Sequence, residues 1–123
     1  MLEIDHINIR TAQLDRLVAF YEGVLGMTSG PRPAFPFPGA WLYLGAQPVV
    51  HLVGVETAPG APREAENLRL EHVAFRGSDL ADFRRRLTEA AVAHEEVPLP
   101  GGEILQLHFF DPDGNHIHVD FRT

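Results

Sequence analysis

Cysteine and lysine are both absent from this 123-residue chain. Without cysteine there are no disulfides, thiolate metal ligands or thiol nucleophiles. Without lysine there is no Schiff-base chemistry on a side-chain amine. Serine is scarce too, because Ser29 and Ser78 are the only two. Few groups are therefore left for covalent catalysis.

Long apolar runs are missing as well, and the opening MLEIDHINIR lacks the basic and then apolar pattern of a signal peptide. We therefore expect no membrane-spanning segment and a cytoplasmic location. The formal net charge of −7 argues against nucleic acid as a partner, because phosphate binding needs a basic surface. The one basic cluster, FRRRL at 83–87, lies in a helical pattern and indicates a solvated helix face.

The chain is long enough to form one domain with a real core, and it consists of two similar halves. DHINIRTAQL, from Asp5, aligns without a gap with EHVAFRGSDL, from Glu71, at an offset of 66. YLGAQPVVHLV, from Tyr43, aligns with FDPDGNHIHVD, from Phe110, at an offset of 67. The first pair predicts an alternating strand followed by a helix start, and the second predicts a hairpin.

These patterns predict an α+β fold of two tandem βαβββ modules in a single domain, 1–123. Module 1 covers about 1–55, a Pro-, Gly- and Ala-rich surface linker about 56–67, and module 2 about 68–123. The first helix is predicted at roughly 12–21. The second, capped by Ser78 or Asp79, is predicted to end at about 91.

Four prolines fall within 31–38, so the segment GPRPAFPFPGAW cannot be a central strand. It is predicted to be an edge strand or an ordered loop. Its aromatic residues, Phe35, Phe37 and Trp41, form either a local cover on the core or a wall of an apolar ligand pocket.

Four of the seven histidines occupy equivalent places in the two halves. His6 and His72 lie in the first predicted strand of each module, and His51 and His118 lie in the last. The alternation of each strand places its histidine opposite the apolar residues that face the helix. Metal binding needs several imidazoles that converge on one point. The pattern therefore predicts a metal site but does not decide which histidines bind.

In its paired modules, its opening DHINIRTAQLDRLVAFYEGVLGM and its closing DPDGNHIHV, the chain resembles the vicinal oxygen chelate superfamily over nearly its whole length. That superfamily includes glyoxalase I, extradiol dioxygenases, fosfomycin-resistance enzymes and bleomycin-binding proteins. The resemblance implies that each module curls a mixed sheet into a half-barrel with one helix on its outer face. It also implies a divalent metal ion (zinc, nickel, manganese, cobalt or iron) and a homodimer, often with a site shared between subunits. By position, the ligands it implies are His6, His51, His72 and His118.

The chain departs from the superfamily where the last strand usually carries glutamate, because His118 stands there, and His51 stands at the matching place in module 1. In glyoxalase-type isomerisation a glutamate removes a proton next to a carbonyl, so a base must come from elsewhere. Asp120 shares the face of His118 about 7 Å along the strand, and Glu103 lies in the PGGEI segment. Either is a candidate base or a solvated surface residue.

Other side chains are candidates for supporting roles. His108 and His116 could orient a ligand or carry a proton, with His116 expected beside the site or at its rim. His94 is expected to be exposed. The candidate substrate-binding residues are aromatic or cationic: Phe35, Phe37, Trp41, Tyr43, Arg10 and Arg76. The two arginines fit salt bridges equally well.

The leading hypothesis is a metal-dependent enzyme that acts on a small oxygen-chelating metabolite, as a glyoxalase-like lyase or isomerase. An extradiol-type dioxygenase that cleaves a catechol-like ring is the first alternative. The second is a non-catalytic drug-binding or resistance protein, which the histidines disfavour because such binders in the superfamily typically lack metal ligands. A purely structural zinc site would fill all four positions and leave no room for substrate.

Overall fold

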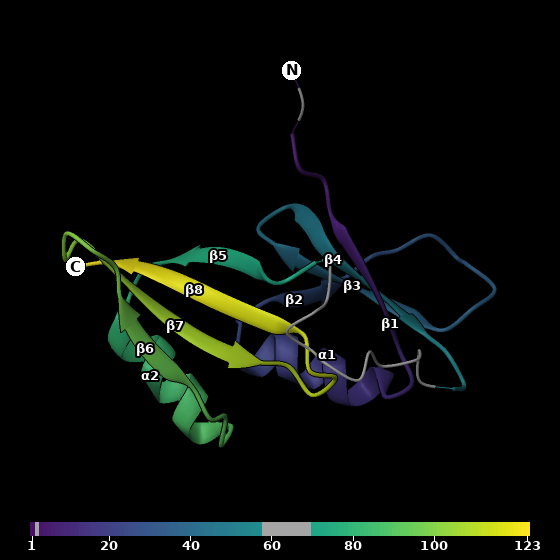
Figure 1. The fold of residues 1–123 in the computed structure, drawn as a ribbon. Helices are drawn as coiled ribbons and strands as arrows, with labels where there is room; N and C mark the ends of the chain where they lie inside the picture. Colours follow the sequence, from purple (N-terminus) through teal and green to yellow (C-terminus); the bar gives the residue numbers. More distant parts are fainter. Residues whose placement is uncertain (2, 58–69) are drawn as a thin grey trace. The chain divides into compact units, whose positions relative to one another are not determined.

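The computed structural model describes residues 1, 3–57 and 70–123, and the chain divides into two compact units, Met1–Ala61 and Pro62–Thr123 (Figure 1). The first unit contains β1 (Ile7–Thr11), α1 (Leu14–Gly23), β2 (Thr28–Gly30), β3 (Gly39–Leu44) and β4 (Gln47–Gly54). The second contains β5 (Val73–Gly77), α2 (Leu80–Glu89), β6 (Glu95–Pro98), β7 (Ile104–Phe110) and β8 (His116–Arg122). The predicted tandem βαβββ fold is confirmed. The predicted linker lies mostly outside the described residues, so its bounds stay predictions.

Each unit folds into a mixed sheet of four strands with the same topology. The strand orders are β1-β4-β3-β2 and β5-β8-β7-β6, so the first and last strands of each module are neighbours. These neighbours run parallel, while the other pairs are antiparallel. Figure 1 shows β8 lying between β5 and β7. The topology therefore brings the histidines at the two ends of each module's sequence side by side.

The core of each unit lies between its helix and one face of its sheet. In α1, Leu17 and Tyr21 are fully buried four positions apart, as expected for one face of a helix. In α2, Phe83 plays the same role, with its ring centroid 5.8 Å from that of Phe109 in β7 and 5.6 Å from that of Phe121 in β8. The helix-facing strand residues are thus the apolar ones that the alternation predicts.

The helices begin and end close to their predicted limits. The first starts two residues later than predicted, because Thr11 still belongs to β1 and its hydroxyl accepts a hydrogen bond from the backbone N–H of Gln13. Asp79 caps the second by accepting from the N–H of Asp82 at 3.1 Å. That helix stops at Glu89 because Ala91 adopts a left-handed φ of 54°. Among the described residues, no helix is long and apolar enough to span a membrane.

The DPDGN turn, residues 111–115, connects β7 to β8. Its conformation depends on Asp111, which is almost fully buried. One carboxylate oxygen of Asp111 accepts from the N–H groups of Asp113 and Asn115, and the other accepts from the Asn115 side chain. Gly114 takes the positive φ of 85° that this turn requires. β8 begins two residues later, at His116.

The proline-rich segment at 31–38 contains no strand, so of the two predicted alternatives the loop holds, and it connects the edge strand β2 to β3. The end of the predicted segment, with Trp41, lies instead in the inner strand β3. Phe35 and Phe37 stack on each other at 5.0 Å, and the guanidinium of Arg32 lies over both rings. Both phenylalanines are about 40% exposed (41% and 40%), so neither belongs to the core of this unit.

Candidate metal centre

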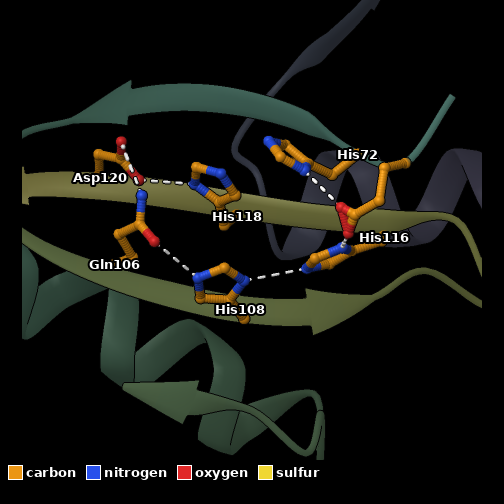
Figure 2. Close-up of polar contacts among 7 residues, drawn as sticks. His72, Gln106, His108, His116, His118 and Asp120 are labelled. Atoms are coloured by element: carbon orange, nitrogen blue, oxygen red, sulfur yellow. Dashed lines mark hydrogen bonds and ion pairs between the residues drawn. The ribbon is translucent and has the colours of Figure 1, made fainter. Parts of the chain in front are cut away.

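Four histidines of the second unit lie on the sheet face opposite α2 (Figure 2), whereas His94 lies between α2 and β6. His118, in the middle of that face, pairs with Ala74 of β5 on one side and with His108 of β7 on the other. Its neighbours in β8, Ile117 and Val119, are buried in the core. Strand alternation therefore separates a histidine face from an apolar face, as the sequence predicts.

Four imidazole rings gather on this face (Figure 2). The ring centroid of His72, just before β5, lies 4.5 Å from that of His118 and 5.4 Å from that of His116. His108 lies 4.6 Å from His118. The side chain of His118 is 6% exposed and that of His116 is 19% exposed, whereas that of His72 is 41% exposed. The group therefore extends from a buried ring to the surface.

Carboxylates hold the Nδ1 atoms of three of these rings. Glu71 places one oxygen 2.7 Å from Nδ1 of His72 and the other 2.8 Å from Nδ1 of His116. Asp120 places an oxygen 2.6 Å from Nδ1 of His118. A carboxylate at Nδ1 keeps the proton there and leaves the Nε2 lone pair free, which is the arrangement that metal-binding histidines commonly show. His72 and His118 are held in this way.

The residues also offer a compact donor set. Glu71, His72 and His116 each contribute one ligand atom, and these atoms all lie within 4.8 Å of one another. Two imidazole nitrogens and one carboxylate oxygen suit zinc and ferrous iron, so the donor chemistry fits a divalent metal ion. This set shares only His72 with the four predicted ligands. The four-histidine set draws on both units and stays a prediction.

The histidines of the first unit are arranged differently. His6, just before β1, stacks on His51 of β4 with ring centroids 3.8 Å apart and planes within 8°. Trp41 of β3 stacks on the other side of His51 at 4.0 Å. A metal ion bound by an imidazole lone pair lies near the plane of that ring, and two nearly parallel planes share no such point. His6 or His51 must therefore rotate before both can bind one ion.

Glu71 is the functional candidate that the sequence analysis missed. A signal was present, because Glu71 aligns with Asp5 in the repeat. Asp5 contacts Nδ1 of His6 at 2.5 Å, as Glu71 contacts Nδ1 of His72. In both modules an acidic residue thus precedes the first-strand histidine and binds its Nδ1. His116 lies within the cluster rather than only at its rim.

The candidate bases occupy different places. Asp120 touches His118 directly, although their backbones are two residues apart on the strand. Glu103 lies just before β7, whose first residue, Ile104, pairs with Arg122. The histidines pair at the other end of this hairpin, where Phe110 lies opposite His116. Of the two predicted bases, Asp120 is therefore near the histidine face and Glu103 is not.

The remaining candidates lie around the sheets. Tyr43 donates its hydroxyl to the carbonyl oxygen of Pro31. Arg10 and Arg76 are exposed strand residues, in β1 and β5. His94 is less exposed than predicted, with 23% of its side chain accessible, and its Nε2 lies 3.8 Å from Glu96. None of these positions decides a role in binding substrate.

Burial and neighbouring charge affect two histidines. Burial lowers the pKa of His51, and the nearby His6 lowers it further. Burial likewise lowers the pKa of His108, with His118 and His116 adding to the effect. Both rings therefore stay neutral to a lower pH than a free histidine, whose pKa is about 6.5.

These shifts predict how stability depends on pH in the metal-free protein. Below about pH 6.5 the unfolded chain binds more protons at these histidines than the folded protein does, so the free energy of unfolding decreases as the pH falls. Urea unfolding at a series of pH values measures this loss, and we expect it to be smaller in His51→Gln. An NMR titration midpoint for His51 at or above the free-histidine value would contradict the prediction.

Two tandem βαβββ modules, each with a mixed four-stranded sheet, are the fold of the vicinal oxygen chelate class of proteins. Residues 3–119 match the family model of the Glyoxalase/Bleomycin resistance protein/Dioxygenase superfamily, and the chain belongs to this superfamily. A relative from Arabidopsis thaliana named Glyoxylase I 4 is 27% identical over 123 residues, which cover 97% of this chain and 70% of the relative.

Solved structures share the fold of this chain. A glyoxylase/bleomycin resistance protein/dioxygenase domain from Frankia sp. EAN1pec superposes with a TM-score of 0.80 at 18% identity, covering 100% of this chain and 99% of the other. An integron cassette protein from V. cholerae gives a TM-score of 0.70 at 28% identity, covering 100% and 97%. The family and the fold that the sequence predicted are both confirmed.

Proposed function

We propose that the protein is a metal-dependent enzyme that acts on a small oxygen-chelating metabolite, as a glyoxalase-like lyase or isomerase. The observation that carries the proposal is the convergence of Glu71, His72 and His116, whose ligand atoms lie within 4.8 Å of one another. The likeness to Glyoxylase I 4 supports a lyase or isomerase among the activities of the superfamily.

The residues of the cluster have distinct roles in this proposal. A divalent metal ion, when bound, supplies Lewis acidity toward the oxygens of the substrate. His72 and His116 hold the ion, and Asp120 fixes the ring of His118 beside them. Hydrogen bonds from His72 and then His116 lower the pKa of Glu71, so this carboxylate is ionised at neutral pH.

Glu71 is also the candidate for the missing base. It is 55% exposed, which lets a substrate approach it, and it lies directly beside two histidines. The glutamates expected from the superfamily are replaced by His51 and His118. Glu71 is therefore the carboxylate best placed in the second unit to accept a proton from a bound substrate.

Metal analysis of protein purified without a metal-affinity tag is the first test. We expect about one equivalent of a divalent metal per chain, and conversion of hemithioacetals by the loaded protein. Metal below about one tenth of an equivalent, even after reloading, would contradict the enzyme and favour a non-catalytic drug-binding protein. Metal-loaded protein without any hemithioacetal conversion would contradict the lyase or isomerase.

A dioxygenase is the second candidate, and the donor set favours it. Two histidines and one carboxylate are the ligands of many non-haem ferrous oxygenases, which keep positions open for substrate and oxygen, and Glu71, His72 and His116 provide that set. Oxygen consumption with catechols by the iron-loaded protein distinguishes this reading from the lyase.

The proposal extends to the assembly and location of the protein. We expect a homodimer with a site shared between subunits, as the family resemblance implies, and a cytoplasmic location with neither nucleic acid nor membrane as a partner. Light scattering with and without metal measures the oligomeric state. A dimer that dissociates when the metal is removed would support a shared site.

A further inference from the structure

A continuous chain of hydrogen bonds crosses the histidine face of the second sheet (Figure 2). It begins at Glu71 and ends at His118, and it passes through four side chains from β7 and β8. The contacts in order are Glu71 to His116 at 2.8 Å, His116 to His108 at 2.9 Å, His108 to Gln106 at 2.9 Å, Gln106 to Asp120 at 3.4 Å and Asp120 to His118 at 2.6 Å. This hydrogen-bond chain therefore connects Glu71 and His116, two of the candidate metal ligands, to His118.

Gln106 sets the direction of the hydrogen bonds in the middle of this chain, between the two carboxylates at which it begins and ends. The Asp120 carboxylate can only accept, so the amide nitrogen of Gln106 must face it and donate. The amide oxygen of Gln106 then faces His108 and accepts from its Nε2–H. This orientation follows from the chemistry of the partners, since no other amide orientation satisfies both neighbours.

The same order of donor and acceptor continues through His108 and His116. A neutral His108 that donates from Nε2 has a lone pair at Nδ1, which accepts from Nε2–H of His116. The lowered pKa of His108 agrees with a neutral ring. The Nδ1 atom of His116 faces the Glu71 carboxylate and needs a positive partner there, either a proton or a metal ion.

The other arm of the chain acts on His118. Gln106 holds one oxygen of Asp120, and the second oxygen accepts from Nδ1–H of His118. This contact leaves Nε2 of His118 as the nitrogen with a free lone pair. Gln106 contacts neither His116 nor His118, so it acts on both rings only through Asp120 and His108.

We propose that Gln106 is a positioning residue that fixes the tautomer of His108 and the donor direction of His116, that holds Asp120 against His118, and that so prepares the metal centre. The inference rests on the proposed metal-dependent function only in its last step. The pattern of tautomers is a property of the metal-free protein, so it is measured independently of any activity.

The experiment uses the full chain labelled with ¹⁵N at histidine. In the metal-free wild-type protein, long-range ¹H–¹⁵N spectra should show the Nδ1–H tautomer for His118 and the Nε2–H tautomer for His108. Two variants separate the two hydrogen bonds of Gln106. Gln106→Met removes both, whereas Gln106→Glu keeps the acceptor that faces His108 but cannot donate to Asp120. Gln13→Met is the matched control, because Gln13 lies in the first unit and its side chain contacts Arg16.

We expect Gln106→Met to lose the Nε2–H signature of His108 and Gln106→Glu to keep it, because only methionine removes the acceptor that faces His108. Both variants should keep the Nδ1–H tautomer of His118, which the Asp120 carboxylate holds. Both should bind a divalent metal about 10-fold more weakly, as variants of outer-sphere partners of metal ligands usually do. Gln13→Met should change neither measurement. Thermal unfolding of each variant shows that it is folded, and Gln106→Glu keeps the test decisive where Gln106→Met fails to fold. Unchanged tautomers and unchanged metal affinity in a folded Gln106 variant would overturn the inference.

The outcomes separate this inference from the proposed function. A wild-type protein that shows the expected tautomers but binds no metal contradicts the metal-dependent function and the last step of the inference, while the hydrogen-bond direction stands. A protein that binds metal equally well in wild-type and Gln106→Met form contradicts the positioning role, while the proposed function stands.

Discussion

Replacing His72 by alanine is expected to lower the affinity for a divalent metal by more than about 100-fold, since even the partners of metal ligands are commonly worth about 10- to 100-fold. His72 is the residue shared by the cluster with Glu71 and His116 and by the predicted four-histidine set. Its loss removes a donor in either arrangement. Competition with a chromogenic chelator measures the affinity.

His94→Ala is the matched control, because His94 is also a partly exposed histidine of the second unit but contacts Glu96 instead of the cluster. It should bind metal as the wild-type protein does. Full metal affinity in His72→Ala would rule out both ligand sets together.

A second pair of variants separates the two sets. His116→Ala should lose most of its metal affinity when Glu71, His72 and His116 bind the ion, whereas His51→Ala should retain it. The opposite result would support the set of His6, His51, His72 and His118. The stacked rings of His6 and His51 favour the first outcome, because they do not point at a common ion as they stand.

Replacing Leu87 by alanine is expected to lower the free energy of unfolding by about 2–5 kcal/mol. Leu87 is fully buried in α2, one turn after Phe83, and it aligns with the buried Tyr21 of α1 in the repeat. The substitution removes apolar surface from the core and leaves a cavity that the sheet cannot fill without moving. Urea unfolding followed by circular dichroism measures the change.

Leu44→Ala is the control for this substitution. Leu44 ends β3 and is 43% exposed, so its truncation should change the free energy of unfolding by no more than about 0.5 kcal/mol. A loss below about 1 kcal/mol in Leu87→Ala would show that α2 contributes little to the stability of its module.

Much of the fold follows from local patterns in the sequence. The alternation in HIHVD places Ile117 and Val119 in the core and His118 on the opposite face, because successive side chains of a strand point to opposite sides. The repeat at an offset of 66 then predicts a second module of the same kind. The helix limits were less exact, since the left-handed φ of Ala91 is not evident from its sequence neighbours.

The candidate site was predictable only in part. The sequence predicted His72 and His118 in the first and last strands of module 2, and β5 and β8 are indeed paired, although His72 lies one residue before β5. It did not show that Glu71 forms a hydrogen bond with His116, a residue 45 positions away, because that contact forms only when β8 pairs with β5. Nor did it show Gln106 as the centre of a hydrogen-bond chain.

The sequence by itself determined the two modules, the faces of their strands and the presence of several imidazoles on each histidine face, because these depend on periodicity and on residue type. The tertiary structure alone decided which nitrogen of each ring is held and which is left free. That choice depends on side-chain rotation and on carboxylates and amides brought in from neighbouring strands. For this reason His6 and His51 stack in one module, while His72, His116 and His118 converge in the other.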